Sequence, residues 1–122
     1  MFRRKPVKWD TANKICKGMG AHLASVHDKK ENNFIKSLIS TVPNTLVWVG
    51  LSDVHKKMKW ADGTRVSYTN WDPGQPDNYM TWFSWVTGED CGGLYNKGGK
   101  WNDSRCDRKY PFVCKAHVTG VN

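Results

Sequence analysis

Apolar residues recur every three or four positions in two segments of the first third of the chain. In the first segment these residues are Ala12, Ile15, Cys16 and Met19. Such spacing gathers side chains on one face of an α-helix. Asp10 near its start and Gly18 or Gly20 near its end are typical of helix boundaries. We therefore predict a helix of about eleven residues between residues 7 and 19.

A second helix is expected to begin after Asp28, because Glu31 follows three residues later and the two form a capping-box pattern. Its predicted buried stripe consists of Phe34, Ile35, Leu38 and Ile39. Pro43 cannot continue a helix, so we expect the helix to end before this residue.

The strongest strand signal is the apolar run "LVWVGL" at residues 46–51, which predicts a fully buried strand in the centre of a sheet. Shorter strands are predicted at residues 23–26 and 110–115. Residues 59–64 carry an Asp-Gly turn signal.

The segment from residue 67 to residue 100 is rich in Gly, Pro, Asn and Asp and has little periodicity, so we predict one long loop. Long loops inside compact domains are uncommon and, when they are ordered, they tend to be functional. The apolar pattern of this segment cannot hold it in place, so another feature must do so.

The length of 122 residues indicates a single domain, residues 1–122, with a modest core. Four cysteines, an even number, suit two disulfides formed in an oxidising compartment. The alternative is a zinc site, which needs close ligand pairs, and the chain offers only Cys114 with His117. The residues alone leave all three disulfide pairings open.

The formal charge of +8 suits acidic partners as a class, which comprises sulfated glycans, bacterial envelopes, anionic lipids, nucleic acids and other acidic polymers. The cations occur in short scattered groups, so a solvated basic surface explains them equally well. No apolar run is long enough to span a membrane. We expect a secreted or extracellular protein, or a domain of a larger secreted or membrane-anchored one, without a nucleic-acid partner.

Five side chains in or just after the predicted loop offer hard oxygen atoms: Gln75, Asp77, Glu89, Asn102 and Asp103. Calcium takes six to eight oxygen ligands from carboxylates, amide carbonyls and waters. Three carboxylates with two amides suit Ca²⁺ better than zinc or iron. The "QPD" tripeptide also fits an ordinary solvated turn, but it occurs together with "GEDC" and "WND". The sequence thus predicts a calcium site in this loop.

Eight short motifs follow one another in the order found in one protein family. They are "W..A...C" (9–16), "GAHLASV" (20–26), "WVGL" (48–51), "W.DG" (60–63), "NW..GQPD" (70–77), "GEDC" (88–91), "KWND" (100–103) and a final Cys with "YPFVCK" (106–115). Over nearly its whole length the sequence therefore resembles a C-type lectin-like domain, and its "QPD" resembles the galactose-type members.

The resemblance implies an α+β fold of two helices and a mixed, mostly antiparallel sheet with a long calcium-binding loop. It also implies two disulfides, Cys16 to Cys114 and Cys91 to Cys106.

The family's principal Ca²⁺ ligands map onto the five oxygen-bearing residues named above, with the backbone oxygen of Asp103 as a further ligand. An auxiliary calcium site is only half matched. Asp53 and Asp90 are present, but Lys57 and Asn78 stand where carboxylates are expected.

In the resembling family, Gln-Pro-Asp marks binding of galactose and N-acetylgalactosamine through a vicinal diol chelated by Ca²⁺. The implied sugar-binding residues are Gln75, Asp77, Tyr79, Trp82, Trp85, Glu89 and Asn102. Tyr79 stands where galactose-type members place a stacking Trp, and Trp82, Phe83 and Trp85 are further candidates. One of these rings is expected to pack on the C–H face of the sugar, unless all of them fold back to plug the loop.

We therefore expect a calcium-dependent lectin, and not an enzyme, for galactose-type glycans on microbial or cell surfaces. A single site should bind weakly, which favours an oligomer or a multidomain parent. The alternative is a protein- or polyanion-binding domain of the same fold that acts through its basic surface. A hydrolase is disfavoured because His22, His27, His55 and His117 are isolated from any nucleophile pattern. We expect four tryptophans to lie in the core or at the base of the loop: Trp48, Trp60, Trp71 and Trp101.

Overall fold

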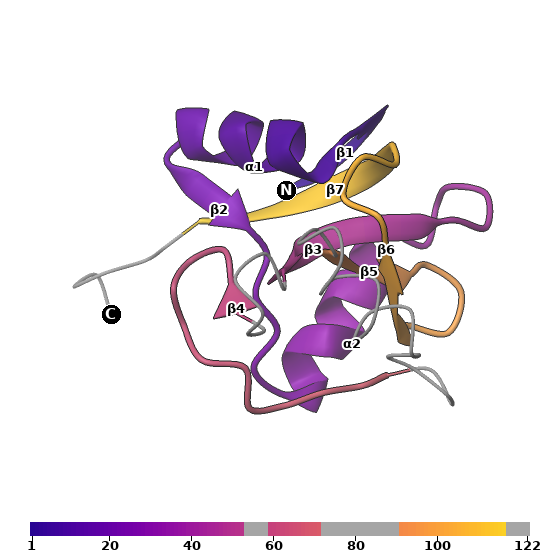
Figure 1. Cartoon of the computed structure of the whole chain (residues 1–122). Coiled ribbons are helices and arrows are strands. Elements are labelled where there is room, and N and C mark those ends of the chain that lie inside the picture. Colours follow the sequence, from indigo (N-terminus) through magenta and orange to yellow (C-terminus); the bar gives the residue numbers. More distant parts are fainter. Residues whose placement is uncertain (53–58, 72–90, 117–122) are drawn as a thin grey trace.

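The computed structural model describes residues 1–52, 59–71 and 91–116. Its elements in chain order are β1 (Phe2–Val7), α1 (Trp9–Gly18), β2 (Ala21–Leu23), α2 (Lys29–Leu38), β3 (Leu46–Ser52), β4 (Lys59–Trp60), β5 (Cys91–Tyr95), β6 (Trp101–Ser104) and β7 (Tyr110–Ala116). The two helices pack on opposite faces of a sheet (Figure 1). No helix in the described part is long and apolar enough to cross a membrane.

The main path of the sheet has the strand order β1-β7-β3-β5-β6, while β2 pairs with β7 and β4 pairs with β3. Every pair is antiparallel except β3 with β7, which run parallel where Trp48 lies opposite Phe112. The expected α+β architecture and mixed, mostly antiparallel sheet are therefore confirmed. As predicted from "LVWVGL", β3 lies in the middle of the sheet.

The side chains of β3 divide the core into two halves. Leu46 and Trp48 pack with α1 residues on one face, whereas Val47, Val49 and Leu51 pack with α2 residues on the other. This division follows from the alternation of side chains along a strand. A strand that is covered on both faces needs apolar residues at every position, which explains the continuous run in the sequence.

Both predicted helices form, and α2 begins as its capping-box pattern predicts. The Asp28 side chain accepts a hydrogen bond from the Glu31 backbone N–H at 2.7 Å, and the Glu31 carboxylate accepts one from the His27 backbone N–H at 2.8 Å. The helix ends at Leu38, five residues before Pro43. Capping side chains of this kind supply partners to backbone N–H groups that the helix itself leaves unpaired.

The predicted buried stripe of α2 was half wrong. Ile35 and Ile39 are buried, but Phe34 is 67% exposed and Leu38 is 36% exposed. The residue that shares the buried face is Asn32, which is 2% exposed. Sequence spacing could not show this, because a buried asparagine reads as a surface residue until its hydrogen-bond partners are known.

The predicted loop at residues 67–100 was too long, since β5 lies inside it. The strand was missed because Gly92 and Gly93 lower its apparent strand propensity. In the fold these glycines are required by close packing. A Cβ on Gly93 would lie 2.7 Å from Leu46 Cγ and from the Val47 carbonyl oxygen. The strand predicted at residues 23–26 instead occupies residues 21–23.

Two disulfides join Cys16 to Cys114 and Cys91 to Cys106, as the family resemblance implied. The first links α1 to β7 across 98 residues of sequence, and the second links β5 to the turn after β6 across 15 residues. In the chain-entropy description, loops of these sizes give about 5 and about 3 kcal/mol of stabilisation.

Asp62 anchors the segment that runs from β4 towards Trp71. Its carboxylate accepts hydrogen bonds from Ser25 Oγ at 2.7 Å and from the Thr64 backbone N–H at 2.9 Å. Burial alone would raise the pKa of Asp62, but the hydrogen bonds from Thr64 and Ser25 and the charge of Lys115 outweigh it, so the pKa is lowered.

A pH-dependent contribution to stability follows from this lowered pKa. The contribution is present above the ordinary value of 3.8 and is lost as the pH falls through the lower, folded-state pKa. We expect Asp62→Asn to lower the melting temperature at pH 6, with the difference from the unmodified protein shrinking below about pH 4. Thermal unfolding from pH 2 to pH 7 measures this. A difference that stays constant over the whole range would contradict it.

Candidate functional site

Two of the five predicted calcium ligands, Asn102 and Asp103, lie next to each other on β6. This strand is the last in the sheet order, so one of its edges is not covered by another strand of the main path. Asn102 lies opposite Gly93 of β5, and Asp103 lies opposite Gly92. Because glycines have no side chain, neither oxygen-bearing residue is crowded by a side chain directly across the strand pair.

The chain enters and leaves residues 72–90 at the two sides of β6. On the entry side, Trp71 forms an isolated parallel bridge with Trp101, and the Trp101 backbone N–H donates to the Asn70 carbonyl at 2.8 Å. On the return side, Cys91 lies opposite Ser104 in the β5–β6 pair. Cys91 is further tied by its disulfide to Cys106. Asn102 and Asp103 therefore lie on the strand between the two anchored ends.

The side chain of Trp101 anchors β6 to the core. Its side chain is fully buried, and three aromatic rings pack against it edge to face. The ring-centre distances from Trp101 are 5.5 Å to Trp60, 5.9 Å to Tyr68 and 5.6 Å to Trp71. Such edge-to-face pairs add to the stabilisation from burial alone. The prediction that Trp60, Trp71 and Trp101 serve the core or the loop base is confirmed, and Trp48 is also fully buried.

Two asparagines that sequence reasoning missed support the same strand. Asn32 accepts a hydrogen bond from the Trp101 indole N–H at 2.7 Å and donates one to the Gly99 carbonyl at 3.0 Å. Asn70 also donates to the Gly99 carbonyl, at 2.9 Å. The sequence signalled this role only for Asn70, which lies in the "NW" motif. No feature of the α2 sequence distinguished Asn32 from a surface residue.

Tyr95 positions the side chain of Asn102. The Asn102 amide nitrogen donates to the Tyr95 hydroxyl at 2.7 Å, and the Asn102 carbonyl oxygen accepts from the Asp103 backbone N–H at 2.9 Å. An amide group has two N–H donors and an oxygen with two lone pairs, so one donor and one lone pair remain for a ligand. Both residues are half-buried. This pair of hard oxygen donors fits part of a calcium site.

The other predicted site residues lie outside the described residues. These are the calcium ligands Gln75, Asp77 and Glu89, the aromatic candidates Tyr79, Trp82, Phe83 and Trp85, and the auxiliary-site residues Asp53 and Asp90. Within residues 1–52, 59–71 and 91–116, no group of three or more His, Cys, Asp or Glu side chains is placed to hold a metal ion. The predicted site is thus described only on its β6 side.

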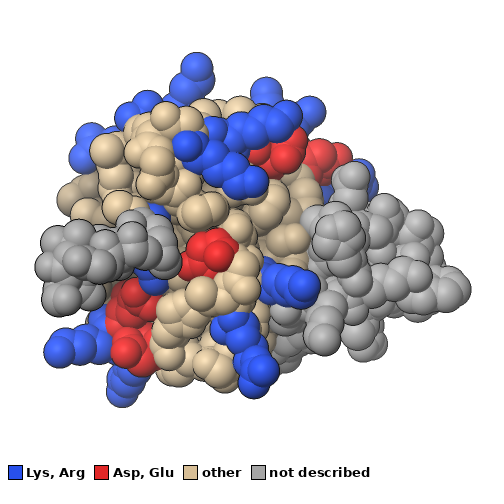
Figure 2. Space-filling model, turned by 90° about the vertical axis from the view of Figure 1, so that its left-hand side faces the viewer, with Lys and Arg blue, Asp and Glu red and all other residues tan. Residues whose placement is uncertain are grey.

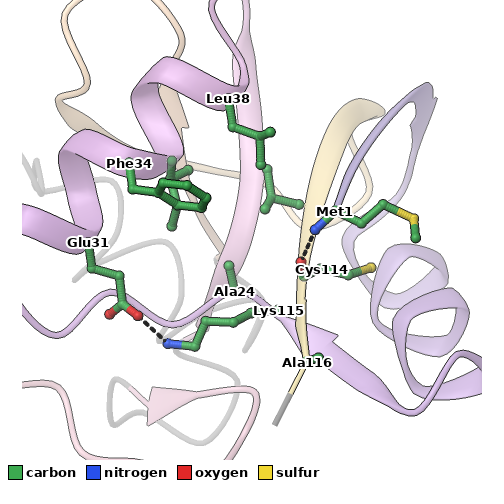
Figure 3. A pocket seen from close by; sticks show the side chains of 10 residues that line it. Met1, Ala24, Glu31, Phe34, Leu38, Cys114, Lys115 and Ala116 are labelled. Carbon is green, nitrogen blue, oxygen red and sulfur yellow. Dashed lines mark hydrogen bonds and ion pairs between the residues drawn. The ribbon is translucent and has the colours of Figure 1, made fainter. Parts of the chain in front are cut away.

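A cavity of about 210 Å³ lies elsewhere, between α2 and β7 (Figure 3). Phe34 and Leu38, the exposed apolar residues of this helix, line it from α2, and Met1 lines it from the start of the chain. The Glu31 carboxylate and the Lys115 ammonium form an ion pair of 2.7 Å beside it. The cavity does not contain either β6 residue, so it belongs to a different part of the surface.

Comparison with known proteins places this geometry in a family. The family profile described as "Lectin C-type domain" matches residues 5–116. The human C-type lectin domain family 10 member A is 36% identical over 117 residues, covering 94% of this chain and 35% of the human protein. The chain thus spans about a third of that relative.

Two further relatives are covered over most of their length. The galactose-specific lectin nattectin of Thalassophryne nattereri is 35% identical over 121 residues, covering 96% of this chain and 72% of nattectin. The carbohydrate-recognition domain of the mouse scavenger receptor C-type lectin superposes with a TM-score of 0.80 at 36% identity, covering 96% of this chain and 88% of that domain. The chain belongs to the C-type lectin domain family, a non-enzymatic fold that includes carbohydrate-recognition domains and also antifreeze proteins.

Proposed function

We propose that the protein is a calcium-dependent lectin that binds terminal galactose or N-acetylgalactosamine. The observation that carries the proposal is the position of β6, with Asn102 and Asp103, between the anchored ends of residues 72–90. Those residues contain the other three candidate ligands, Gln75, Asp77 and Glu89. C-type lectin domains generally bind Ca²⁺, and the five residues keep a hard oxygen donor at every ligand position of the resembling sugar-binding members.

Chain length permits all five residues to meet. Glu89 lies two residues before Cys91, so their Cα atoms are at most about 7 Å apart. Gln75 lies four residues after Trp71, within about 14 Å of it, and Asp77 lies within about 22 Å. Since both anchors adjoin β6, no ligand needs more chain than the sequence supplies.

The charge pattern supports a cation site in the same place. Residues 72–90 contain Asp72, Asp77, Glu89 and Asp90 and no lysine or arginine, although the chain as a whole carries a formal charge of +8. An acidic segment on a basic protein lowers the cost of holding a divalent cation. When bound, Ca²⁺ would accept two vicinal sugar hydroxyls in place of water, and the second N–H of the Asn102 amide could donate to one of them.

Preference for galactose rests on the order of acid and amide in "QPD". The reversed tripeptide, Glu-Pro-Asn, has the same charge but exchanges hydrogen-bond donors and acceptors, so it favours diols of different geometry. Nattectin, a relative whose name describes it as galactose-specific, is 35% identical to this chain. Glycans that end in galactose, on microbial or cell surfaces, are the proposed partners, and C-type lectin domains occur in both secreted and membrane-anchored proteins.

A glycan array read with calcium and with a chelator tests the proposal. We expect signals on glycans that end in galactose or N-acetylgalactosamine, and we expect the chelator to abolish them. Single-site affinity should be weak because one diol and one ring bury little surface, so the protein should be displayed in multivalent form. Binding that survives chelation, or a preference for mannose over galactose, would refute this function.

A further inference from the structure

A second charged surface runs from β1, at the edge of the sheet opposite β6, to the turn between β6 and β7. Its cations are Arg3 and Lys5 of β1, Lys8 at the start of α1, and Arg108 and Lys109 in the turn before β7; all five are exposed, and we name them the basic edge. In the sheet order, β1 and β6 are separated by β7, β3 and β5. At the usual spacing of strands the β1 cations lie about 19 Å from β6. Arg108 and Lys109, by contrast, lie in the turn that follows β6 and leads to β7.

Strand pairing brings the two halves of the basic edge together. Val7 of β1 lies opposite Tyr110 of β7, and the two strands are antiparallel. Lys8, which follows Val7, therefore adjoins Lys109, which precedes Tyr110. The Trp9 backbone N–H also donates to the Cys106 carbonyl at 3.1 Å, which holds the start of α1 against the turn. Arg108 is fixed in that turn by its backbone N–H, which donates to the Arg105 carbonyl at 3.1 Å.

The positive charge of the basic edge is not neutralised locally. Among the described residues, none of its five cations forms an ion pair with a carboxylate. The nearby carboxylates are already engaged, Asp107 with Arg105 at 3.0 Å and Asp10 with Lys14 at 3.3 Å. Like charges on adjoining strand positions destabilise a fold slightly, so such a group is easier to explain if an external anion binds it.

Protection of an edge strand does not account for the whole group. Lysine and proline on an edge strand oppose unwanted strand pairing, and Lys5 with Pro6 serves that purpose on β1. Lys8, Arg108 and Lys109 lie outside the strand, where no edge needs protection. Arg4 is on β1 but is not part of the group, since it donates to the Thr41 hydroxyl at 3.4 Å.

We propose that the basic edge binds a linear sulfated polysaccharide, independently of calcium and of the galactose site. The extended segment from Arg3 of β1 to Lys8, the N-cap of α1, spreads its charges over about 16 Å, which suits a chain of repeated anionic groups better than one compact anion. The arginine guanidinium groups offer paired donors to sulfate oxygens. Figure 2 shows basic side chains along the top of the molecule, where Figure 1 places α1 and β1, with acidic side chains beside some of them.

Two other polyanions fit the surface less well. Binding of single-stranded nucleic acid relies on aromatic rings that stack on bases. The aromatic residues that adjoin the group in sequence are buried or half-buried against the core: Phe2, Trp9 and Tyr110. Anchoring in a membrane interface needs apolar side chains beside the cations. Among the described residues, the large exposed apolar side chains are Met1, Met19, Phe34 and Leu38. Met1 lies beside Arg3, whose guanidinium is 3.8 Å from its sulfur, but none of the four lies in the turn of residues 105–109, which carries the other part of the group.

The test compares two triple variants of the whole chain that remove equal charge. The first is Lys5→Gln, Lys8→Gln and Lys109→Gln in the basic edge; the control is Lys29→Gln, Lys30→Gln and Lys36→Gln on α2, all of them exposed lysines. Titration calorimetry with heparin, in buffer that contains a chelator, measures affinity at several salt concentrations. Circular dichroism melting verifies that both variants remain folded.

We expect heparin binding that persists in the chelator and is not reduced by excess galactose. The basic-edge variant should bind at least tenfold more weakly than the unmodified protein, and the control less than threefold more weakly. The slope of log affinity against log salt should become shallower by about one for each lysine that no longer pairs with a sulfate group. Equal losses in both variants, a need for calcium, or tighter binding to single-stranded DNA or to phosphatidylserine vesicles would each overturn the proposal. Failure to bind galactose would refute the calcium site and leave this result unaffected.

Discussion

Asp103→Asn is expected to abolish calcium-dependent galactose binding while the domain stays folded. Asp103 lies on β6, opposite a glycine, and is proposed to contribute both its carboxylate and its backbone oxygen to Ca²⁺. The substitution keeps the shape of the side chain but removes one of the three carboxylates that balance the ion. Loss of a residue that only supports a metal ligand typically costs 10–100-fold in affinity, so loss of a direct ligand should cost at least about 100-fold.

Asp107→Asn is the matched control, since Asp107 lies four residues further on, is exposed, and pairs with Arg105. It removes the same charge from the same end of the molecule without touching the proposed site. Calorimetric titration of Ca²⁺ into each variant measures the effect. If both variants lost affinity equally, only the general electrostatic field would matter, and Asp103 would not be a ligand.

Trp101→Ala is expected to give the largest loss of stability of any single substitution near the site. The indole is fully buried, contacts three aromatic rings, and donates to the Asn32 side chain at 2.7 Å. Truncation of a buried Trp costs about 3–5 kcal/mol, a large share of the 5–15 kcal/mol that stabilises a typical domain. It would also leave the Asn32 side-chain oxygen buried without its partner.

Trp101→Ala should also affect the candidate calcium site, in addition to lowering stability. It bridges to Trp71, so its removal should loosen the entry side of residues 72–90 as well as the core. Trp9→Ala is a suitable control, because Trp9 is also buried, donates to the Val49 carbonyl at 2.9 Å and packs in the α1 half of the core. We expect urea unfolding to show a similar destabilisation for both.

Under conditions where both variants are folded, only Trp101→Ala should weaken calcium binding, by more than tenfold. Should either alanine variant fail to fold, Trp101→Phe and Trp9→Phe permit the same comparison, since phenylalanine keeps most of the ring volume. Equal calcium affinities for the two variants would show that Trp101 supports the core but not the site.

Sequence signals that span only a few residues predicted much of the fold. The pattern of Asp28 and Glu31 predicted the start of α2, and the continuous apolar run predicted the central strand, because both signals act over a few residues. The signals that failed depend on distant neighbours. Gly92 and Gly93 lower the local strand propensity but permit close packing against β3. Asn32 is polar and was therefore expected at the surface, but it is buried because it accepts a hydrogen bond from the Trp101 indole.

The candidate site could be predicted as a set of residue types and only partly as an arrangement. Asn102 and Asp103 share one strand, and no local pattern indicated that Tyr95 would hold the Asn102 amide. That contact depends on the register of β5 with β6, which is fixed by tertiary packing around the glycine pair. The role of each aromatic ring between Asp77 and Glu89 stays a prediction.

A crystal structure of the protein with calcium and galactose, with anomalous scattering used to identify calcium, is the most direct measurement. We predict one strong calcium peak bonded to the Asn102 side-chain oxygen, to Asp103, and to Gln75, Asp77 and Glu89, with two adjacent galactose hydroxyls completing its shell. An aromatic ring from residues 79–85 should lie against the sugar. Galactose bound away from β6, or no calcium at Asn102 and Asp103, would contradict the account.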